Sequence, residues 1–204
     1  MVSGFITLVR HGKVAGPAAL YGHTDIILSE QGRTELQHTL TQLHREKPIA
    51  SIISSPLLRC AQVANEFSQR HALPLQLQEK LKEMNFGDWD GVDFNQLQNQ
   101  WPQLKAFWDH PNQKQPPNGE SLNNFSQRII SAWEEAVQQG RPEHSVIICH
   151  GGVIRIIIAH ILGLELGNAR LFQQLHIDYA SYTGIELHSE PELRAVIKHI
   201  GASY

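Results

Sequence analysis

The chain has 204 residues, of which 41% are hydrophobic and 18% are charged, and its formal net charge is −3. This length fits one ordinary globular domain with a sizeable core. The slightly acidic balance excludes a broad basic surface for nucleic acid or for an anionic membrane. An anionic ligand would therefore have to be held by local positive charge.

Neither apolar run of the sequence has the features of a targeting or membrane segment. FITLV near the N-terminus lacks a basic head and is too short for a secretory signal, and VIRIIIAHILGL falls short of the ~20 residues that span a bilayer. Two cysteines, Cys60 and Cys149, make no disulfide framework, and free thiols fit a reducing compartment. We therefore expect a cytoplasmic protein without a membrane partner, and no pattern specifies an oligomeric state.

The first part of the chain alternates predicted strands with predicted helices. Residues 5–9 favour a strand buried on both faces, and residues 28–46 favour a helix that Ser29 caps. Residues 50–55 favour a second strand, and Pro56 is predicted in the first turn of the helix that follows. This order is typical of an α/β sheet with parallel neighbours.

Residues 84–118 are predicted to leave the sheet as an excursion rather than to form a domain of their own. They carry an apolar stripe at helical spacing that Pro102 interrupts, and residues 110–119 have the composition of a loop. We interpret the stripe as core rather than as a platform for stacking on a ligand. Its members are Phe94, Leu97, Trp101, Leu104 and Trp108.

The pattern of strands and helices resumes after the excursion. Residues 121–140 favour a helix with an apolar face and with Gly140 past its end, and we interpret Glu120 as complementing the N-terminus of this helix. Residues 145–149 favour a third buried strand, followed by a helix that two glycines open. Apolar alternation after Leu175 predicts two more strands.

Two of the predicted strands end in a similar way. Arg10 and His11 precede a glycine after the first strand, and His150 precedes two glycines after the third. Ligands of open α/β sheets bind beyond the carboxyl ends of the strands, so the two histidines are expected to face one crevice. Arg59 follows the end of the second strand. Two arginines, two histidines and helix N-termini form a cationic cluster that suits a phosphate group.

Four motifs in this order resemble those of the histidine phosphatase superfamily, which includes the cofactor-dependent phosphoglycerate mutases. They are RHG, SSPLLRC, LKEMNFGDWDG and CHGG, and the resemblance covers essentially the whole chain. The stretches YGHTD, NFGDWDG and PPNGESLNNFSQRI are most similar to the alpha-ribazole phosphatases of cobalamin assembly. The resemblance implies a three-layer α/β/α sandwich with a mostly parallel central sheet. It further implies one domain, residues 1–204, whose excursion at about 84–118 covers the active site.

The resemblance also implies a role for each residue of the cluster. His11 would attack phosphorus and carry the phosphoryl group as phosphohistidine. Arg10, Arg59 and a cationic His150 would hold the phosphate oxygens as charge develops. Glu83 would protonate the leaving group and then take a proton from water. Neither a metal ion nor a cofactor is required.

The remaining site residues follow less directly from the motifs. Glu83 is preferred to the nearby Glu79 because it precedes FGDW as the acid of the family does. Related enzymes carry an asparagine that contacts the phosphate in the loop after the first motif, but residues 13–24 contain none. Gly22 or His23 is predicted to replace that contact, and Gly151 is predicted to contact the substrate as well.

A rival reaction can be assigned to some of the same residues. CHGGVIR fits the pattern C-x-x-G-x-x-R of cysteine phosphatases, with Cys149 as nucleophile and Arg155 on the phosphate. However, Cys149 belongs to a predicted buried strand, where a thiol stays protonated. This alternative also leaves the RHG motif and Arg59 unexplained.

The expected function is that of a phosphomonoesterase acting on a small phosphate ester, with alpha-ribazole 5'-phosphate as the expected substrate. The segment after Glu83 is acidic at Asp88 and Asp90 and resembles the phosphatases more than the mutases. A phosphoglycerate mutase or a broad-specificity sugar-phosphate phosphatase is the alternative within the superfamily. A non-catalytic module that binds phosphorylated ligands would be indicated by loss of the nucleophile or the acid, and both are present.

Overall fold

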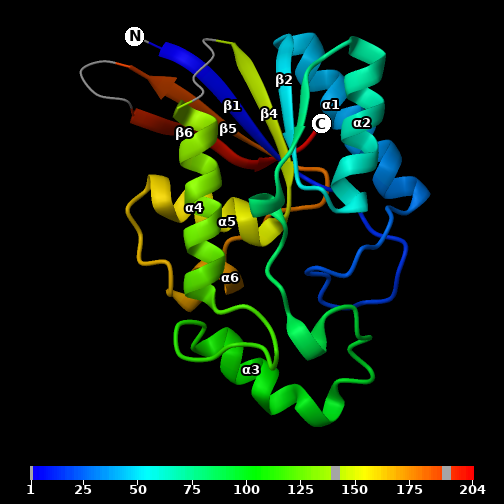
Figure 1. The fold of residues 1–204 in the computed structure, drawn as a ribbon, viewed down its shortest axis with the longest axis vertical. Helices are drawn as coiled ribbons and strands as arrows, with labels where there is room; N and C mark the ends of the chain where they lie inside the picture. The colour runs from blue at the N-terminus through cyan, green and yellow to red at the C-terminus, as the bar shows by residue number, and fades with distance from the viewer. Residues whose placement is uncertain (1, 139–142, 190–193) are drawn as a thin grey trace.

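The computed structural model describes residues 2–138, 143–189 and 194–204. Within these residues, six strands form one sheet in the order β3-β2-β4-β1-β5-β6 (Figure 1). The strands β3, β2, β4 and β1 run parallel, whereas β5 pairs antiparallel with β1, and β6 pairs antiparallel with β5. Their bounds are β1 Val2–Arg10, β2 Ile49–Ser54, β3 Leu75–Leu77, β4 His144–Cys149, β5 Tyr182–His188 and β6 Arg194–Ala202. The predicted mostly parallel sheet is confirmed.

Helices cover both faces of this sheet (Figure 1). On one face lie α1 (Glu30–Glu46) and α2 (Leu58–His71), and on the other lie α4 (Leu122–Gln138) and α5 (Gly151–Ile161). Side chains alternate along β4, so that Val146 and Ile148 pack with α1 and α2, whereas Ile147 and Cys149 pack with α4 and α5. The central strands are therefore buried on both sides, and the predicted three-layer sandwich is confirmed.

The predicted start of α1 is confirmed, whereas the predicted start of α2 is wrong. Ser29 caps α1 as predicted, because its Oγ accepts a hydrogen bond of 3.0 Å from the backbone N–H of Gly32. The prediction that Pro56 lies in the first turn of α2 is wrong, since this helix begins at Leu58. The chain still pairs with β4 at Ser55, whose N–H donates to Ile148, and it can turn into a helix only after that bond. Asp25 then accepts from the free N–H of Leu58 at 2.7 Å.

The excursion forms the end of the molecule below the sheet in Figure 1. It contains short 3₁₀ turns and the helix α3 (Trp101–Asp109). Pro102 lies in the first turn of α3, where a helix needs no N–H donor, so it begins a helix instead of interrupting one. Of the predicted stripe, Leu97 and Leu104 are buried but Trp101 is 50% exposed. Phe107, which the predicted stripe did not include, is buried instead. The reason is that α3 begins only at Trp101, and its buried face carries Leu104 and Phe107.

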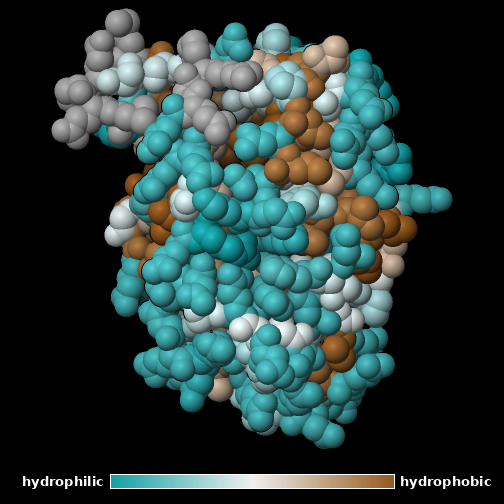
Figure 2. Space-filling model, viewed as in Figure 1, coloured by the Kyte–Doolittle hydropathy of each residue, from teal (hydrophilic) through white to brown (hydrophobic). Residues whose placement is uncertain are grey.

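Excursion and sheet share one core. Leu97, Leu104 and Phe107 belong to the same cluster of buried residues as the inward faces of α4 and α5. This continuity supports the proposal that residues 1–204 form one domain. Most side chains on the face of the excursion and α4 seen in Figure 2 are hydrophilic.

The second part of the chain matches the predicted order. The two strands predicted after Leu175 are β5 and β6, whereas β3 and the short α6 (Ala169–Gln173) were not predicted because each has too few residues to show a period. The predicted helix end at Gly140 lies outside the described residues. No helix in the described ranges is long and apolar enough to cross a bilayer.

Candidate active site

His11 and His150 meet at the carboxyl ends of two neighbouring parallel strands. Arg10, the last residue of β1, pairs with Cys149, the last residue of β4, so the next residue of each chain segment is a histidine. The backbone N–H of His11 donates to the carbonyl of Cys149 at 3.0 Å. The centroids of the two imidazole rings are 5.1 Å apart in an edge-on arrangement, and both side chains are buried. The crevice expected from the sequence therefore brings these two rings together.

The position of the proton on His11 follows from its backbone contact. Its Nδ1 lies 2.8 Å from the carbonyl oxygen of Gly12, and because a carbonyl only accepts, Nδ1 carries the proton. Burial, followed by the charges of Arg59 and Arg10, holds the pKa of His11 well below its ordinary value of 6.5. His11 is therefore neutral, with a lone pair on Nε2, which is the form that a nucleophile requires.

His150 is neutral as well, and its proton sits on the other ring nitrogen. Nε of Arg59 donates to Nδ1 of His150 at 3.2 Å, so Nε2 carries the proton and donates to Oγ of Ser55 at 2.8 Å. Burial, followed by the Arg59 charge, lowers the pKa of His150 well below 6.5. The cationic His150 expected from the sequence is corrected here, because Arg59 occupies the nitrogen that would take the second proton.

Arg59 is fully buried and connects three parts of the site. Besides its bond to His150, it donates to the backbone carbonyls of Tyr21, Gly22 and Thr24 at 2.9, 2.6 and 2.9 Å. Four of its five N–H groups are thus used within the protein. The side chain predicted to grip a phosphate here orders the loop at residues 21–24 and the ring of His150.

Arg10 keeps one buried donor without a partner. Its Nη1 donates to the carbonyl of Ile177, and its guanidinium stacks 3.9 Å from the centroid of the Tyr179 ring. Its Nε is buried and has no hydrogen-bond partner among the described residues. A methyl group placed on Gly151 would lie 3.4 Å from this Nε and 3.0 Å from Nη1 of Arg155. The space over Gly151 is therefore bounded by two guanidinium groups, which suits an anion.

Glu83 lies at the N-terminus of α5, beside this space. Its Oε2 accepts from the N–H of Gly152 at 2.9 Å, and its Oε1 accepts from the N–H of Met84 at 3.0 Å. A side chain on Gly152 would collide with the carboxylate, so this close approach requires glycine. Glu79, the other candidate for the acid, is 73% exposed and pairs with Lys82. Of these two glutamates, the fold brings only Glu83 to the site.

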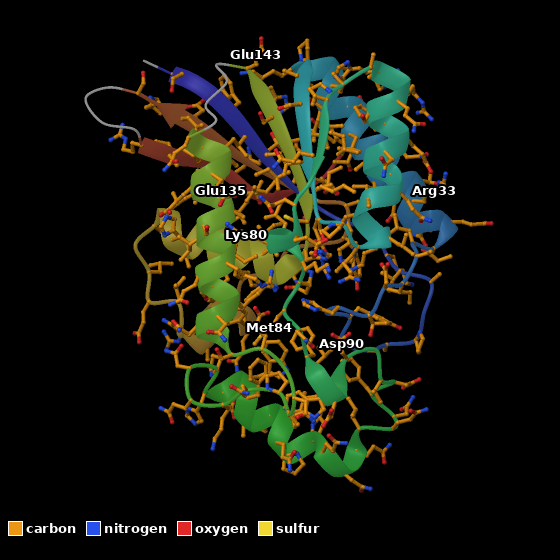
Figure 3. All side chains as sticks on the ribbon, in the orientation of Figure 1. Arg33, Lys80, Met84, Asp90, Glu135 and Glu143 are labelled. Carbon is orange, nitrogen blue, oxygen red and sulfur yellow. The ribbon has the colours of Figure 1, made fainter. Side chains whose placement is uncertain are left out.

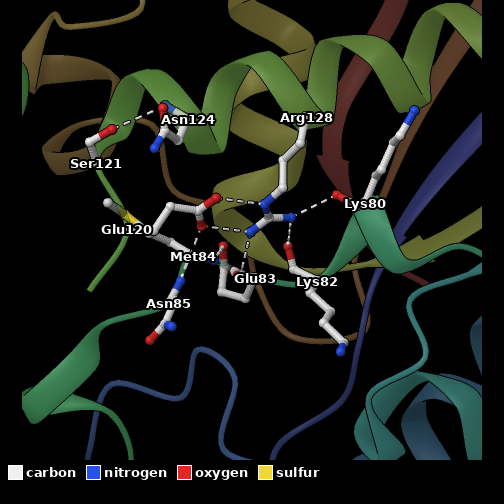
Figure 4. Close-up of polar contacts among 9 residues, drawn as sticks. All are labelled: Lys80, Lys82, Glu83, Met84, Asn85, Glu120, Ser121, Asn124 and Arg128. Carbon is white, nitrogen blue, oxygen red and sulfur yellow. Dashed lines mark hydrogen bonds and ion pairs between the residues drawn. The ribbon is translucent and has the colours of Figure 1, made fainter. Parts of the chain in front are cut away.

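A network that the sequence did not predict positions the backbone of Glu83 (Figure 4). Arg128 of α4 donates to the carbonyls of Lys80, Lys82 and Glu83 at 2.7, 2.6 and 2.9 Å. The same guanidinium makes two parallel bonds, of 2.7 and 2.8 Å, to the carboxylate of Glu120. Glu120 lies two residues before α4, so its interpretation as complementing that N-terminus stays a prediction, and the structure adds its pair with Arg128. A spacing of eight residues is not a pattern that indicates a pair, so only the fold identifies this one.

Asp90 is a second residue whose role was missed. It lies in the excursion (Figure 3). Its carboxylate accepts from the backbone N–H groups of Gly22, His23 and Thr24 at 3.0, 2.7 and 3.0 Å. The N–H groups of Gly22 and His23 are therefore occupied. A phosphate contact from this loop, predicted to replace the missing asparagine, is left to the exposed ring of His23 and stays a prediction.

The geometry disfavours Cys149 as a nucleophile. Its side chain is 0% exposed and packs in the core between β4 and α5. Burial raises the pKa of Cys149 well above its ordinary value, and raises that of the neighbouring Cys60 to about 12. Arg155, the other member of that motif, donates through Nε to the carbonyl of Leu175 at 2.9 Å. Such surroundings disfavour the thiolate, which is the form of cysteine that acts as a nucleophile.

Metal-binding residues do not gather around the histidines. In the part of the chain that the structure describes, no group of three or more His, Cys, Asp or Glu side chains is arranged to hold a metal ion. The positive charge of the site comes from Arg10, Arg59 and Arg155.

The fold, the paired histidines and the arginines agree with the family that the sequence motifs resemble. The chain belongs to the histidine phosphatase superfamily (branch 1), whose family model matches residues 6–196. It is 27% identical over 172 residues to glucosyl-3-phosphoglycerate phosphatase from Mycolicibacterium vanbaalenii, which covers 80% of this chain and 76% of that protein. Three further mycobacterial relatives, 27% identical over 195 residues, are about twice as long, since the match covers 91% of this chain and 50% of each of them.

Solved structures resemble the chain over nearly its whole length. The complex of mycobacterial glucosyl-3-phosphoglycerate phosphatase with VO3 superposes with a TM-score of 0.84 and 26% identity, covering 98% of this chain and 99% of the other. A putative alpha-ribazole-5'-P phosphatase from Escherichia coli has a TM-score of 0.83 and 22% identity, covering 98% and 97%. At that identity the second likeness supports the fold alone.

Proposed function

We propose that the chain is a phosphomonoesterase that passes the phosphoryl group of a small phosphate ester first to His11 and then to water. The observation that carries this proposal is the protonation of His11: Nδ1 donates to the carbonyl of Gly12, which leaves the lone pair of Nε2 free. The buried Nε of Arg10, which has no hydrogen-bond partner among the described residues, supplies a donor over Gly151. Phosphatases among the relatives support hydrolysis over a mutase reaction.

The reaction proceeds in two displacements. The lone pair on Nε2 of His11 forms a bond to phosphorus while the bond from phosphorus to the alcohol oxygen breaks, and protonated Glu83 gives its proton to the leaving oxygen. The Glu83 carboxylate then takes a proton from water, whose oxygen attacks phosphorus as the bond to His11 breaks. Phosphate and neutral His11 are restored.

The charge of the phosphoryl group is offset by fixed donors. Arg10 and the N-terminus of α5 face the phosphate, and Arg59 keeps His150 in place. The ring of His150 is neutral and packs edge-on against that of His11, so the positive charge comes from the arginines. These groups supply the electrostatics without a metal ion. The buried free thiols of Cys60 and Cys149 support a cytoplasmic location.

Two substrates are candidates for this site. The stretches shared with alpha-ribazole phosphatases support alpha-ribazole 5'-phosphate. The relatives at 26% and 27% identity support glucosyl-3-phosphoglycerate instead. A panel of both esters at one pH, together with phosphoglycerates, a simple sugar phosphate and an aryl phosphate, ranks them by kcat/KM.

Trapping the phosphoenzyme tests the mechanism. Protein quenched in alkaline denaturant should carry phosphate that is retained in alkali and lost on acidification, as expected for a nitrogen–phosphorus bond but not for a phosphate ester. His11→Ala should remove both the label and the turnover while the circular dichroism spectrum stays unchanged. A labelled, active His11→Ala protein would overturn the proposal.

A further inference from the structure

A cavity of about 220 Å³ lies next to Glu83, between the excursion and the α4–α5 side of the sheet. It is lined mainly by apolar side chains from the segment after Glu83, from α3, from the start of α4 and from α6. Six of them are Met84, Phe86, Phe107, Trp108, Pro111 and Phe172. Of the apolar stripe that we interpreted as core from the sequence, Trp108 lines this cavity.

Trp108 is the centre of the aromatic wall of this cavity. Its ring lies 4.8 Å from that of Phe107, 6.2 Å from that of Phe86 and 6.3 Å from that of Phe172, centroid to centroid. These rings come from three separate parts of the chain, and the contacts between them hold the wall in shape. The rings are tilted by 45° to 59° against Trp108, so a flat ring that enters the cavity can stack on one of them and meet another edge-on.

The cavity is continuous with the candidate active site. Glu83 and Gly152 both line it, and they are joined by the 2.9 Å hydrogen bond that places the carboxylate. In the proposed reaction Glu83 protonates the oxygen of the leaving alcohol. The remainder of that alcohol is attached to the same oxygen, so it extends into the space that Glu83 borders.

The chemistry of the lining separates possible alcohols. Glu83 and Arg155 are its charged members, and the N–H of Gly152 is already used by Glu83. A sugar would bring several hydroxyl groups into a wall that offers few partners, and each unmatched group costs free energy. An apolar ring has no hydroxyl groups that would be left without a hydrogen-bond partner there. At ~30 Å³ per water, the volume corresponds to about seven waters, which is room for one ring or two fused rings.

We propose that this cavity binds the leaving group and that the protein prefers phosphate monoesters whose alcohol carries a flat, apolar ring. The inference rests on the proposed function, because it uses Glu83 as the acid. It narrows the substrate class of that same site from any small phosphate ester to ring-bearing ones, and of the two candidate substrates it disfavours glucosyl-3-phosphoglycerate, whose alcohol carries a sugar and no flat ring.

Binding without turnover gives the first test. Calorimetry should find that benzylphosphonate binds the wild-type protein about 10-fold or more tightly than methylphosphonate, since the two differ only in the ring that enters the cavity. Equal dissociation constants would overturn the cavity proposal. The measurement requires no catalysis, so it remains valid if the proposed reaction is wrong.

Turnover gives the second test, with benzyl phosphate and methyl phosphate. Their alcohols have similar acidity, so the ratio of the two kcat/KM values reports ring binding rather than leaving-group chemistry. Trp108→Ala should bring the ratio close to one. Trp101→Ala is the matched control, because Trp101 lies in the same helix but is half exposed and is not among the cavity residues, and the ratio should be unchanged. If Trp108→Ala is unfolded by circular dichroism, Phe172→Leu replaces it.

The outcomes separate the two proposals. Turnover of both esters at equal kcat/KM would leave the phosphatase in place and overturn the cavity assignment. A preference for benzylphosphonate, with no turnover of either ester and no phosphoenzyme, would support the cavity and overturn the proposed function.

Discussion

Nε of Arg59 donates a hydrogen bond to Nδ1 of His150 at 3.2 Å, across 91 positions of the sequence. This contact sets which nitrogen of His150 carries the proton, and through Ser55 it sets the direction in which that proton points. Both side chains are fully buried, so the arrangement is isolated from solvent. The two histidines of the site are therefore uncharged in the folded protein.

The uncharged histidines predict a loss of stability in acid. The folded pKa values of His11 and His150 lie well below 6.5. Between pH 7.5 and 5.5 the unfolded chain therefore binds protons on these two histidines that the folded protein does not bind. The free energy of unfolding is therefore greatest above pH 6.5 and decreases as the pH is lowered. The decrease is up to about 1.4 kcal/mol for each histidine between pH 7.5 and 5.5. Urea unfolding at the two pH values measures it. His150→Gln should reduce the difference by about that amount, whereas the exposed His38→Gln should leave it unchanged. An unaltered difference in His150→Gln would contradict the neutral ring.

Glu83→Gln should act according to the leaving group. An alkoxide needs a proton as it departs, so hydrolysis of an alkyl phosphate should slow by about 10²-fold or more. A nitrophenolate is stable without one, so the burst of phosphoenzyme formation from the aryl ester should change much less. Glu79→Gln is the control and should match the wild type, because its side chain lies in solvent. Equal losses in that step for both esters would show that Glu83 positions the phosphate instead of donating a proton.

Arg128 is predicted to act on catalysis through Glu83 and on stability through Glu120. Arg128→Met leaves three backbone carbonyls and a largely buried carboxylate without their donor, which should cost about 2 kcal/mol or more. In protein that remains folded, kcat for an alkyl phosphate should fall while the affinity for inorganic phosphate changes little. Arg33→Met is the control, since its pair with Glu66 is exposed at the right-hand edge of Figure 3 and should contribute less than about 1 kcal/mol.

A double variant separates these two effects. Adding Glu120→Gln to Arg128→Met removes the unpaired charge and should restore part of the stability. It should not restore kcat, because the backbone of Glu83 still lacks its donor. Recovery of kcat together with stability would mean that Arg128 matters only for folding.

The thiols should be dispensable for turnover. Cys149→Ala should retain kcat within a few-fold, and iodoacetamide should leave the native enzyme active, because both cysteines are buried and their pKa values are raised. Phosphate release from an aryl ester measures both. An inactive Cys149→Ala protein with unchanged circular dichroism would contradict this prediction and support Cys149 as the nucleophile.

Activity is expected to persist in excess EDTA. Arg10, Arg59, Arg155 and the α5 N-terminus supply the charge that a metal ion provides in many other phosphoryl-transfer enzymes. Steady-state rates before and after chelation and dialysis provide the measurement. Loss on chelation, with recovery on adding one divalent metal, would contradict the roles proposed for the two histidines.

The amino-acid sequence by itself determined the alternation of strands and helices and the end of the sheet at which the site lies. Ser29 at the start of α1 and the apolar runs of β1 and β4 are local patterns, because a period of two or 3.6 residues is visible within a few turns of chain. The placement of His11 and His150 followed from a general rule, since both come directly after parallel strands.

Only the tertiary structure decided how the site is supported and charged. The bonds from Arg128 to the backbone of Glu83, and from Asp90 to the loop at residues 22–24, join segments 45 and up to 68 positions apart, and no local period records them. The neutral state of His150 depends on burial and on Arg59, neither of which a motif specifies. The cavity around Trp108 exists because rings from separate elements pack without filling the space beside Glu83. Such features arise from how distant surfaces meet, which local sequence patterns do not specify.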